Sequence, residues 1–167
     1  MKSVLILALA VASLAAPLAQ AADARAGEPS HAGQAAPATD KLGKARTLIA
    51  ARQWSAAIDE LKRVDDKSSA DWNNLMGYTM RKGKTPDLTA SEQYYDQALR
   101  IDPHHRNTLE YSGELSLMKG DLAKAQARLA SLNGECGTAC SQYSNLKAAI
   151  DRYQANGNKY LDQANAW

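Results

Sequence analysis

Two cysteines, Cys136 and Cys140, are the residues whose type and spacing most directly suggest chemistry, and they lie at the ends of the stretch CGTAC. Such a pair can form a disulfide bond, act as a redox-active dithiol or bind a soft metal ion. A continuous helix would present the two sulfur atoms poorly, but Gly134 and Gly137 are expected to break any helix here. We predict a structural disulfide, which would stabilise the fold by only about 2 kcal/mol because its ring is short. The redox pair and the metal site remain alternatives.

Other cofactor and metal sites lack the residues that they need. Covalent haem attachment requires a histidine directly after the second cysteine of a pair separated by two residues. Here three residues separate the cysteines, and Ser141 follows the second one. His104 and His105 come directly after Pro103, in a predicted turn where exposed polar residues are ordinary. We therefore predict no cofactor and no metal ion.

The sequence shows no recognisable catalytic arrangement. Gly83-Lys84-Thr85 resembles the end of a phosphate-binding loop, but Tyr78 occupies the position where that motif needs a glycine. No serine, histidine and acidic residue occur in a recognisable nucleophile setting. The sequence also contains just three histidines, and histidine is the side chain that most often acts as a general base. We predict that the protein is not an enzyme.

Residues 1–21 have the pattern of a secretory signal peptide. Lys2 supplies the positive start, Val4 to Leu14 form a short apolar core, and small residues ending at Ala21 form a cleavage site. The apolar run is shorter than the roughly 20 residues that span a bilayer, so an uncleaved membrane anchor is the less favoured alternative. We expect a periplasmic or secreted protein that starts at Ala22 and has no stable membrane insertion after cleavage.

The remaining chain divides into a linker and one domain. Residues 22–39 are rich in alanine, glycine and proline and contain no large apolar side chain, so we expect a flexible linker. Residues 40–167 are enough for one domain with a modest hydrophobic core. The formal charge of the chain is +2, and it falls to +1 when Lys2 leaves with the signal peptide. This balance gives no electrostatic reason to expect nucleic acid or an anionic membrane as the partner.

Apolar residues recur at helical spacing through the domain and predict a series of paired helices. Turn residues divide the series into three pairs, over about residues 40–68, 69–104 and 105–134. An unpaired amphipathic helix follows over about residues 141–154, and it suits the task of covering the exposed end of the last pair. Asp40 is the expected N-cap of the first helix, because its carboxylate can accept hydrogen bonds from free backbone amides.

The second pair carries the clearest motif of the chain. Its first helix starts at Trp72 and has the small residue Gly77 at its middle, a turn begins at Gly83, and the second helix closes with ALRIDP. The third pair keeps small residues at the same spacing, at Gly113, Gly120 and Ala125. These features resemble the tetratricopeptide repeat (TPR). The resemblance implies an all-α fold, a right-handed helical-hairpin solenoid of three TPR-like pairs with a C-terminal capping helix.

In TPR proteins the first helix of each pair lines a concave groove in which ligand peptides lie. Carried over by position, the resemblance implies the groove residues Arg46, Asn74, Tyr78, Arg81, Glu110 and Glu114. The register in the second pair differs by one residue when Gly83 rather than Gly77 is the anchor. Leu42, Asn107 and Tyr111 occupy three positions where some family members carry the residues that clamp a C-terminal carboxylate, so no such clamp is expected. For each groove residue the alternative is an ordinary solvated helix face.

We therefore expect a non-catalytic exported scaffold that binds a protein or peptide segment in its concave groove, within an envelope assembly. The alternative from another class is a thiol-disulfide or metal-handling protein that uses Cys136 and Cys140. A third hypothesis is a subunit that only self-associates. The identity of the partner and the oligomeric state stay open at this point.

Overall fold

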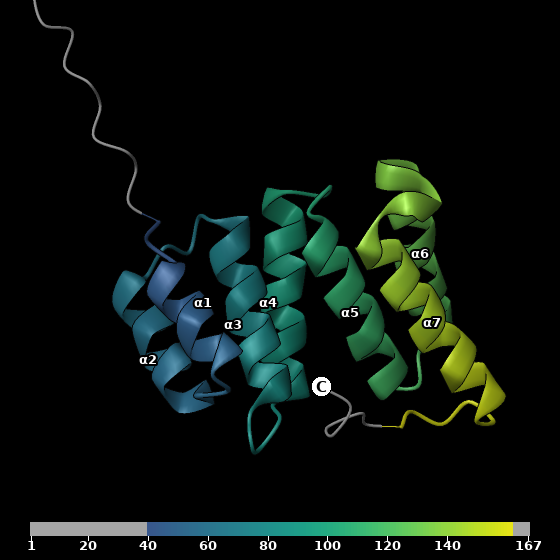
Figure 1. Cartoon of the computed structure of the whole chain (residues 1–167), viewed down its shortest axis with the longest axis horizontal. Coiled ribbons are helices and arrows are strands. Elements are labelled where there is room, and N and C mark those ends of the chain that lie inside the picture. Colours follow the sequence, from purple (N-terminus) through teal and green to yellow (C-terminus); the bar gives the residue numbers. More distant parts are fainter. Residues whose placement is uncertain (1–39, 162–167) are drawn as a thin grey trace, which may run out of the picture. The chain divides into compact units, whose positions relative to one another are not determined.

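The computed structural model describes residues 40–161, and these residues form seven α-helices, one short 3-10 helix and no β-strand (Figure 1). The predicted all-α class is therefore confirmed for this part of the chain. The predicted signal peptide (residues 1–21) and linker (residues 22–39) lie outside the described residues, and so does Trp167. None of the helices between residues 40 and 161 is long and apolar enough to cross a membrane.

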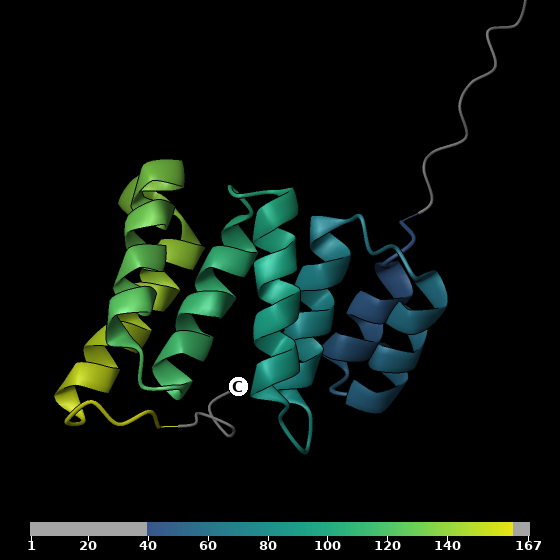
Figure 2. The ribbon, with the colours of Figure 1, turned by 180° about the vertical axis from the view of Figure 1, so that it is seen from behind.

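The helices pack in the order in which they occur along the chain. Their bounds are α1 Gly43–Ala50, α2 Trp54–Val64, α3 Ala70–Lys82, α4 Leu88–Ile101, α5 Arg106–Met118, α6 Leu122–Cys136, η1 Gly137–Ala139 and α7 Ser141–Ala155. Short turns join α1 to α2, α3 to α4 and α5 to α6, and the two helices of each pair pack together, as both views show (Figure 2). The last helix, α7, packs on both α5 and α6.

Side-chain caps explain where most of these helices begin. The Ser69 hydroxyl and the carboxylates of Asp87 and Asp121 each accept a hydrogen bond from a backbone amide in the first turn of the helix that follows. The predicted cap at Asp40 is wrong, because α1 begins at Gly43 and its N-cap residue is Leu42. Asp40 lies two residues before Leu42, and its carboxylate accepts a hydrogen bond of 3.1 Å from the Leu42 amide.

Glycine determines the end of α6, although not at the residue that we predicted. Gly134 was expected to break the helix, but α6 continues through it to Cys136. An isolated glycine costs a helix only about 1 kcal/mol, which the packing of α6 against α5 and α7 offsets. The helix ends at Gly137, whose φ of +61° lies in the left-handed region that other residues rarely adopt.

Close helix contacts occur at two glycines, Gly77 and Gly113. A β-carbon built on Gly77 would lie 2.7 Å from the Tyr95 ring and 3.1 Å from the Ser91 carbonyl oxygen, so α3 and α4 need a glycine here to pack this closely. A β-carbon built on Gly113 would lie 2.6 Å from Leu146 of α7. The two glycines therefore allow α4 to approach α3 and α7 to approach α5.

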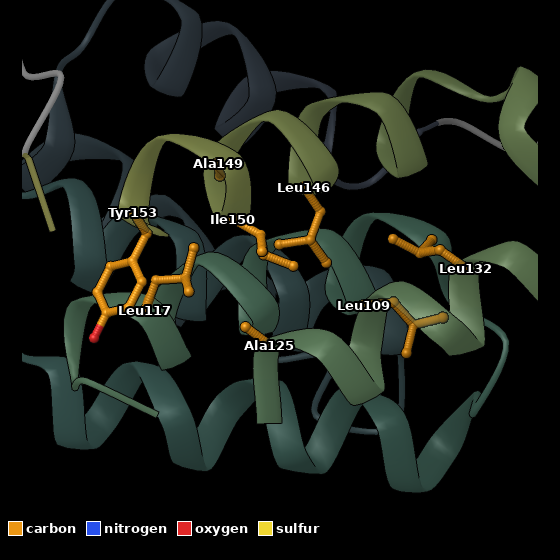
Figure 3. Close-up of a cluster of buried hydrophobic side chains, with 8 residues drawn as sticks. All are labelled: Leu109, Leu117, Ala125, Leu132, Leu146, Ala149, Ile150 and Tyr153. Atoms are coloured by element: carbon orange, nitrogen blue, oxygen red, sulfur yellow. The ribbon is translucent and has the colours of Figure 1, made fainter. Parts of the chain in front are cut away.

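Two clusters of buried apolar side chains form the core. One lies between the first two pairs and consists of Leu42, Ala45, Leu61, Trp72 and Met76. The other joins the third pair to α7 and consists of Leu109, Leu117, Ala125, Leu132, Leu146, Ala149, Ile150 and Tyr153 (Figure 3). Half of the second cluster comes from α7. The last helix therefore contributes as many residues to this cluster as α5 and α6 together.

Candidate functional site

A groove with a volume of about 810 Å³ lies along the face formed by α1, α3, α5 and α7. Neither α4 nor α6 contributes a residue to its wall. We call this site the groove; its lining residues are Ile49, Ala50, Arg52, Trp54, Tyr78, Arg81, Lys82, Gly83, Lys84, Pro86, Glu110, Tyr111, Glu114, Met118, Asn145, Ala148, Arg152 and Tyr160. Most of the residues from α3 and α5 belong to the C-terminal halves of those helices. The groove therefore lies toward one end of the helix pairs.

Arg81 is the buried cation of the groove. Its side chain is 1% exposed, and its Nη1 donates a hydrogen bond of 2.6 Å to Glu114 Oε2, which joins α3 to α5. The guanidinium carbon lies 5.7 Å from the centroid of the Tyr78 ring and 5.6 Å from that of Tyr111. Both distances suit cation–π attraction, and the two ring centroids are 4.8 Å apart. One ion pair and two aromatic rings thus hold the guanidinium in place.

Unpaired polar atoms are concentrated next to this cation. Among residues 40–161, four buried side-chain atoms have no hydrogen-bond partner, and three of them are Nε and Nη2 of Arg81 and the hydroxyl of Tyr95. Burial, opposed by the nearby Arg81 charge, raises the pKa of Tyr95 to about 12. Buried polar groups are nearly always paired, so unpaired ones need an explanation, and functional sites are a common one.

Glu110 is a buried carboxyl group on the α5 side of the groove. The residue is 6% exposed, and its Oε1 accepts a hydrogen bond of 3.0 Å from Asn145 Nδ2 of α7. Burial raises the pKa of Glu110 to about 7, the neighbouring Glu114 adds to this effect, and Asn145 and Arg81 oppose it. At neutral pH the group therefore exists in both protonation states, and it can offer either a carboxylate oxygen or an acid proton to a ligand.

Aromatic and cationic side chains form the outer part of the groove. The Trp54 ring centroid lies 6.3 Å from that of Tyr78, and Tyr160 contributes from the segment after α7. Burial raises the pKa of the hydroxyls of Tyr78 and Tyr111, so both remain protonated at neutral pH and can donate hydrogen bonds. The cationic residues besides Arg81 are Arg52, Lys82, Lys84 and Arg152. This combination offers flat apolar faces beside positive charges.

Four of the six predicted groove residues line the groove, namely Tyr78, Arg81, Glu110 and Glu114, whereas Arg46 and Asn74 do not. Those two belong to a second cluster near the N-terminal ends of α1, α3 and α5. We call this cluster the polar network; it consists of Asp40, Arg46, Asp71, Asn74, His105 and Thr108.

Hydrogen bonds connect every member of the polar network. Arg46 donates to both oxygens of Asp40, at 2.7 and 2.8 Å, and to Asp71 at 3.1 Å. His105 Nε2 lies 3.0 Å from the other oxygen of Asp71, and His105 Nδ1 accepts from the Thr108 amide at 3.2 Å. The Thr108 hydroxyl donates to Asn74 Oδ1 at 3.1 Å. These contacts tie the three first helices together.

Part of the polar network is arranged like a catalytic triad, with Asp71 in the place of the acid, His105 of the base and Thr108 of the nucleophile. The Thr108 hydroxyl oxygen lies 2.8 Å from His105 Nδ1. However, Thr108 has no exposed surface, and its hydroxyl is engaged by Asn74. A substrate cannot reach this oxygen in the folded chain. The trio therefore acts as a connection between helices and as the N-terminal cap of α5.

Cys136 and Cys140 are bonded to each other, which confirms the predicted disulfide, and their α-carbons are 5.8 Å apart. The bond spans η1 and joins the last residue of α6 to the residue before α7. Neither cysteine lines the groove. No group of three or more histidine, cysteine, aspartate or glutamate side chains in the described part of the chain is arranged to hold a metal ion.

Three of the lining residues that the sequence did not predict come from α7. Asn145, Ala148 and Arg152 repeat at helical spacing and form one stripe that faces the groove. The neighbouring stripe, which includes Leu146 and Ile150, faces the core. Only the apolar stripe was predicted, because α7 was interpreted as a helix that covers the third pair. If α7 is instead treated as the first helix of a further pair, its second stripe is expected to face the groove.

No protein-family model matches this sequence, and a search of curated proteins finds no match either. The function is therefore inferred from the geometry and chemistry of the groove.

Proposed function

We propose that this chain is a non-catalytic exported scaffold whose groove holds an extended segment of a partner protein. The observation that carries the proposal is the groove itself, where two tyrosine rings and a buried arginine come together from α3 and α5. Grooves of this kind, with aromatic anchors and a few polar groups, are typical of peptide recognition.

We further propose that the helices form a right-handed solenoid of three TPR-like pairs with α7 as the cap. The pairing of consecutive helices and the close contacts at Gly77 and Gly113 support this arrangement. In such a solenoid the first helices of successive pairs lie side by side and line one face. The lining of the groove supports this proposal, since α1, α3 and α5 all contribute to it and α7 extends the series.

The chemistry of the lining residues suits an extended peptide. Tyr78 and Tyr111 present rings with protonated hydroxyls, so that they can pack against side chains and donate hydrogen bonds. Asn145 and Glu110 also line the groove and can bond to backbone amides and carbonyls, which a peptide exposes along its whole length. No lining residue is a serine, cysteine or histidine that could act as a nucleophile or general base.

The proposed site of action is the periplasm or the cell exterior, within an envelope assembly. The signal-like residues 1–21 motivate this proposal, and the disulfide between Cys136 and Cys140 supports it, because disulfides persist mainly in oxidising compartments. We take the disulfide to be structural, fixing the angle at which α7 leaves α6. Titration of free thiols in the native protein at graded glutathione concentrations tests this assignment. A redox-active disulfide would exchange with glutathione under mildly reducing conditions, whereas a structural one would stay intact.

Site-specific crosslinking tests the proposed function. A photoreactive residue in place of Lys84, in the groove, is compared in the producing cells with one in place of Gln126, an exposed residue of α6. We expect discrete protein adducts from position 84 that are absent from position 126. The adducts should disappear when Trp54→Ala and Tyr78→Ala are added, with the helical circular dichroism spectrum unchanged. Equal adducts from both positions, or adducts that persist in the double variant, would contradict the proposal.

A further inference from the structure

We propose that the segment held in the groove is acidic: an extended peptide of the partner whose aspartate or glutamate side chains lie against the cations of the groove. This inference rests on the proposed function and names the chemistry of its ligand. The charge distribution of the chain carries it.

Positive charge is concentrated in the groove. Five cationic side chains and two carboxyl groups line it, which gives a formal charge of +3. The formal charge of the whole chain is only +2, so the residues outside the groove sum to −1. A nearly neutral protein whose excess positive charge lies around this groove has a field that attracts anionic ligands to it.

Three of these cations are available to a ligand. Arg81 is occupied by Glu114, but the side chains of Lys82, Lys84 and Arg152 make no hydrogen bond or ion pair with any residue between 40 and 161. Lys84 and Arg152 are exposed, and Lys82 is half-buried. Outside the groove, Lys119 and Lys124 pair with Glu92. The exposed Lys41 and Lys62 are also unpaired within these residues, but they do not line the groove. The groove thus keeps cations whose counter-charge the described chain does not supply.

The carboxyl groups of the groove favour a peptide over a nucleic acid. Glu110 and Glu114 line the same wall, where they would repel a closely spaced series of phosphates. A peptide can place its acidic side chains near Lys84 and Arg152 and lay its backbone along Asn145 and Glu110. Aromatic faces at Tyr78 and Tyr111 accept apolar side chains between the acidic ones.

Glu110 should couple binding of such a peptide to proton uptake. The charged and titratable groups that face it are Tyr78 and Arg81 from α3, Tyr111 and Glu114 from α5, and Arg152 from α7, with the neutral Asn145 as its direct partner. An anionic ligand in the same groove disfavours the ionised form of Glu110. Since the free group titrates near pH 7, the complex holds more protons than the free chain, and binding should tighten as the pH falls from 8 to 6.

A display selection tests the inference with defined probes. A random library of 12-residue peptides is selected against the whole chain at low salt, and enriched peptides are remade with each Asp and Glu replaced by Asn and Gln. We expect the enriched set to be acidic, and the neutral versions to bind about tenfold more weakly. The double variant Lys82→Glu, Lys84→Glu should lose about tenfold in affinity. The matched control Lys41→Glu, Lys62→Glu has the same net charge, changes exposed lysines outside the groove, and should bind as the wild type does.

The outcomes separate this inference from the proposed function. Enriched peptides that are neutral or basic but lose binding in the Trp54→Ala, Tyr78→Ala variant would overturn the acidic ligand and leave the groove as the binding site. Peptides that bind that variant as well as the wild type would overturn the proposed function itself. Equal losses in the two double charge variants, or tighter groove-dependent binding of a 12-nucleotide single strand than of any peptide, would also overturn the inference. A gain of about fivefold between pH 8 and 6, lost in Glu110→Gln, would support it.

Discussion

The face formed by the first helices carries two polar clusters, the polar network near the N-terminal ends of α1, α3 and α5, and the groove near their C-terminal ends. In the network every side chain has a partner, from the Asp40–Arg46 pair to the hydrogen bond between Thr108 and Asn74. In the groove the Arg81 guanidinium keeps two nitrogen atoms without a partner in the described chain. The same three helices therefore present one satisfied and one unsatisfied polar cluster.

The difference indicates what each cluster contributes. A satisfied network adds to stability and gives no reason to bind anything further. Unpaired buried nitrogens and a carboxyl group with a pKa near 7 reduce stability, and folding alone does not explain why they are present. We infer that substitutions in the network change mainly stability, whereas substitutions in the groove change mainly binding. The predictions below test this contrast.

The largest effect is expected for Gly77→Ala, at the close contact between α3 and α4. The added β-carbon would lie 2.7 Å from the Tyr95 ring, which has no exposed surface and so cannot move aside, and 3.1 Å from a backbone oxygen of α4. We expect a loss of about 3 kcal/mol in the free energy of unfolding, measured by urea titration. The matched control is Gly134→Ala, where nothing lies within 4 Å, and it should be neutral or stabilising. A loss below about 1 kcal/mol for Gly77→Ala would show that α3 and α4 can separate easily.

The second prediction concerns how much the ionised Glu110 carboxylate lowers the free energy of unfolding. Its pKa is raised from 4.5 to about 7, so the folded chain binds more protons than the unfolded chain between these values, and stability falls as the pH rises through them. Glu110→Gln removes the charge and keeps the oxygen that accepts from Asn145. We expect it to raise the free energy of unfolding by about 2 kcal/mol at pH 8 and to leave it nearly unchanged at pH 5.

Glu114→Gln is the matched control for that experiment. Glu114 pairs with Arg81, so its neutralisation leaves a buried cation without a counter-charge and should destabilise the chain at both pH values. If Glu110→Gln were destabilising at pH 8, the ionised carboxylate would be a stabilising partner of Arg81, and the groove would be as well satisfied as the polar network.

The third prediction tests the network through His105→Ala. This change removes the ring that caps the Thr108 amide and contacts Asp71, so we expect a loss of about 1.5 kcal/mol in the free energy of unfolding. Affinity for a groove-binding peptide should stay unchanged. His104→Ala is the control, since His104 is exposed and bonds only to Asp102 and Glu135, and it should melt as the wild type does. Loss of peptide binding in His105→Ala alone would remove the functional distinction between the two clusters.

Helical spacing and turn residues were enough to predict an all-helical domain. The resemblance to the TPR then suggested Tyr78, Arg81, Glu110 and Glu114 as groove residues, and residues three or four positions apart do lie on one side of a helix. These features depend on local spacing, which a single sequence contains.

The polar network could not be predicted in the same way. Its central contact joins Asp71 to His105, which are 34 positions apart, and no spacing rule connects them. Asn74 is only one helical turn before Tyr78, so their spacing offers no reason to assign the two residues to different clusters. The unpaired nitrogens of Arg81 likewise depend on where Tyr95 and Glu114 lie after folding. Long-range pairing and burial are properties of the packed structure.

The smallest effect is expected for Arg46→Ala, which tests whether this residue belongs to the network or to the groove. Arg46 bonds to Asp40 and Asp71, but its side chain is 42% exposed, and water and salt screen such pairs. We expect the melting temperature to fall by about 2 °C or less, with a smaller shift in 1 M salt, and peptide affinity to stay the same. A drop in affinity without a drop in melting temperature would place Arg46 in the binding surface. The groove would then extend from the C-terminal to the N-terminal ends of the helices, and the contrast between the two clusters would no longer hold.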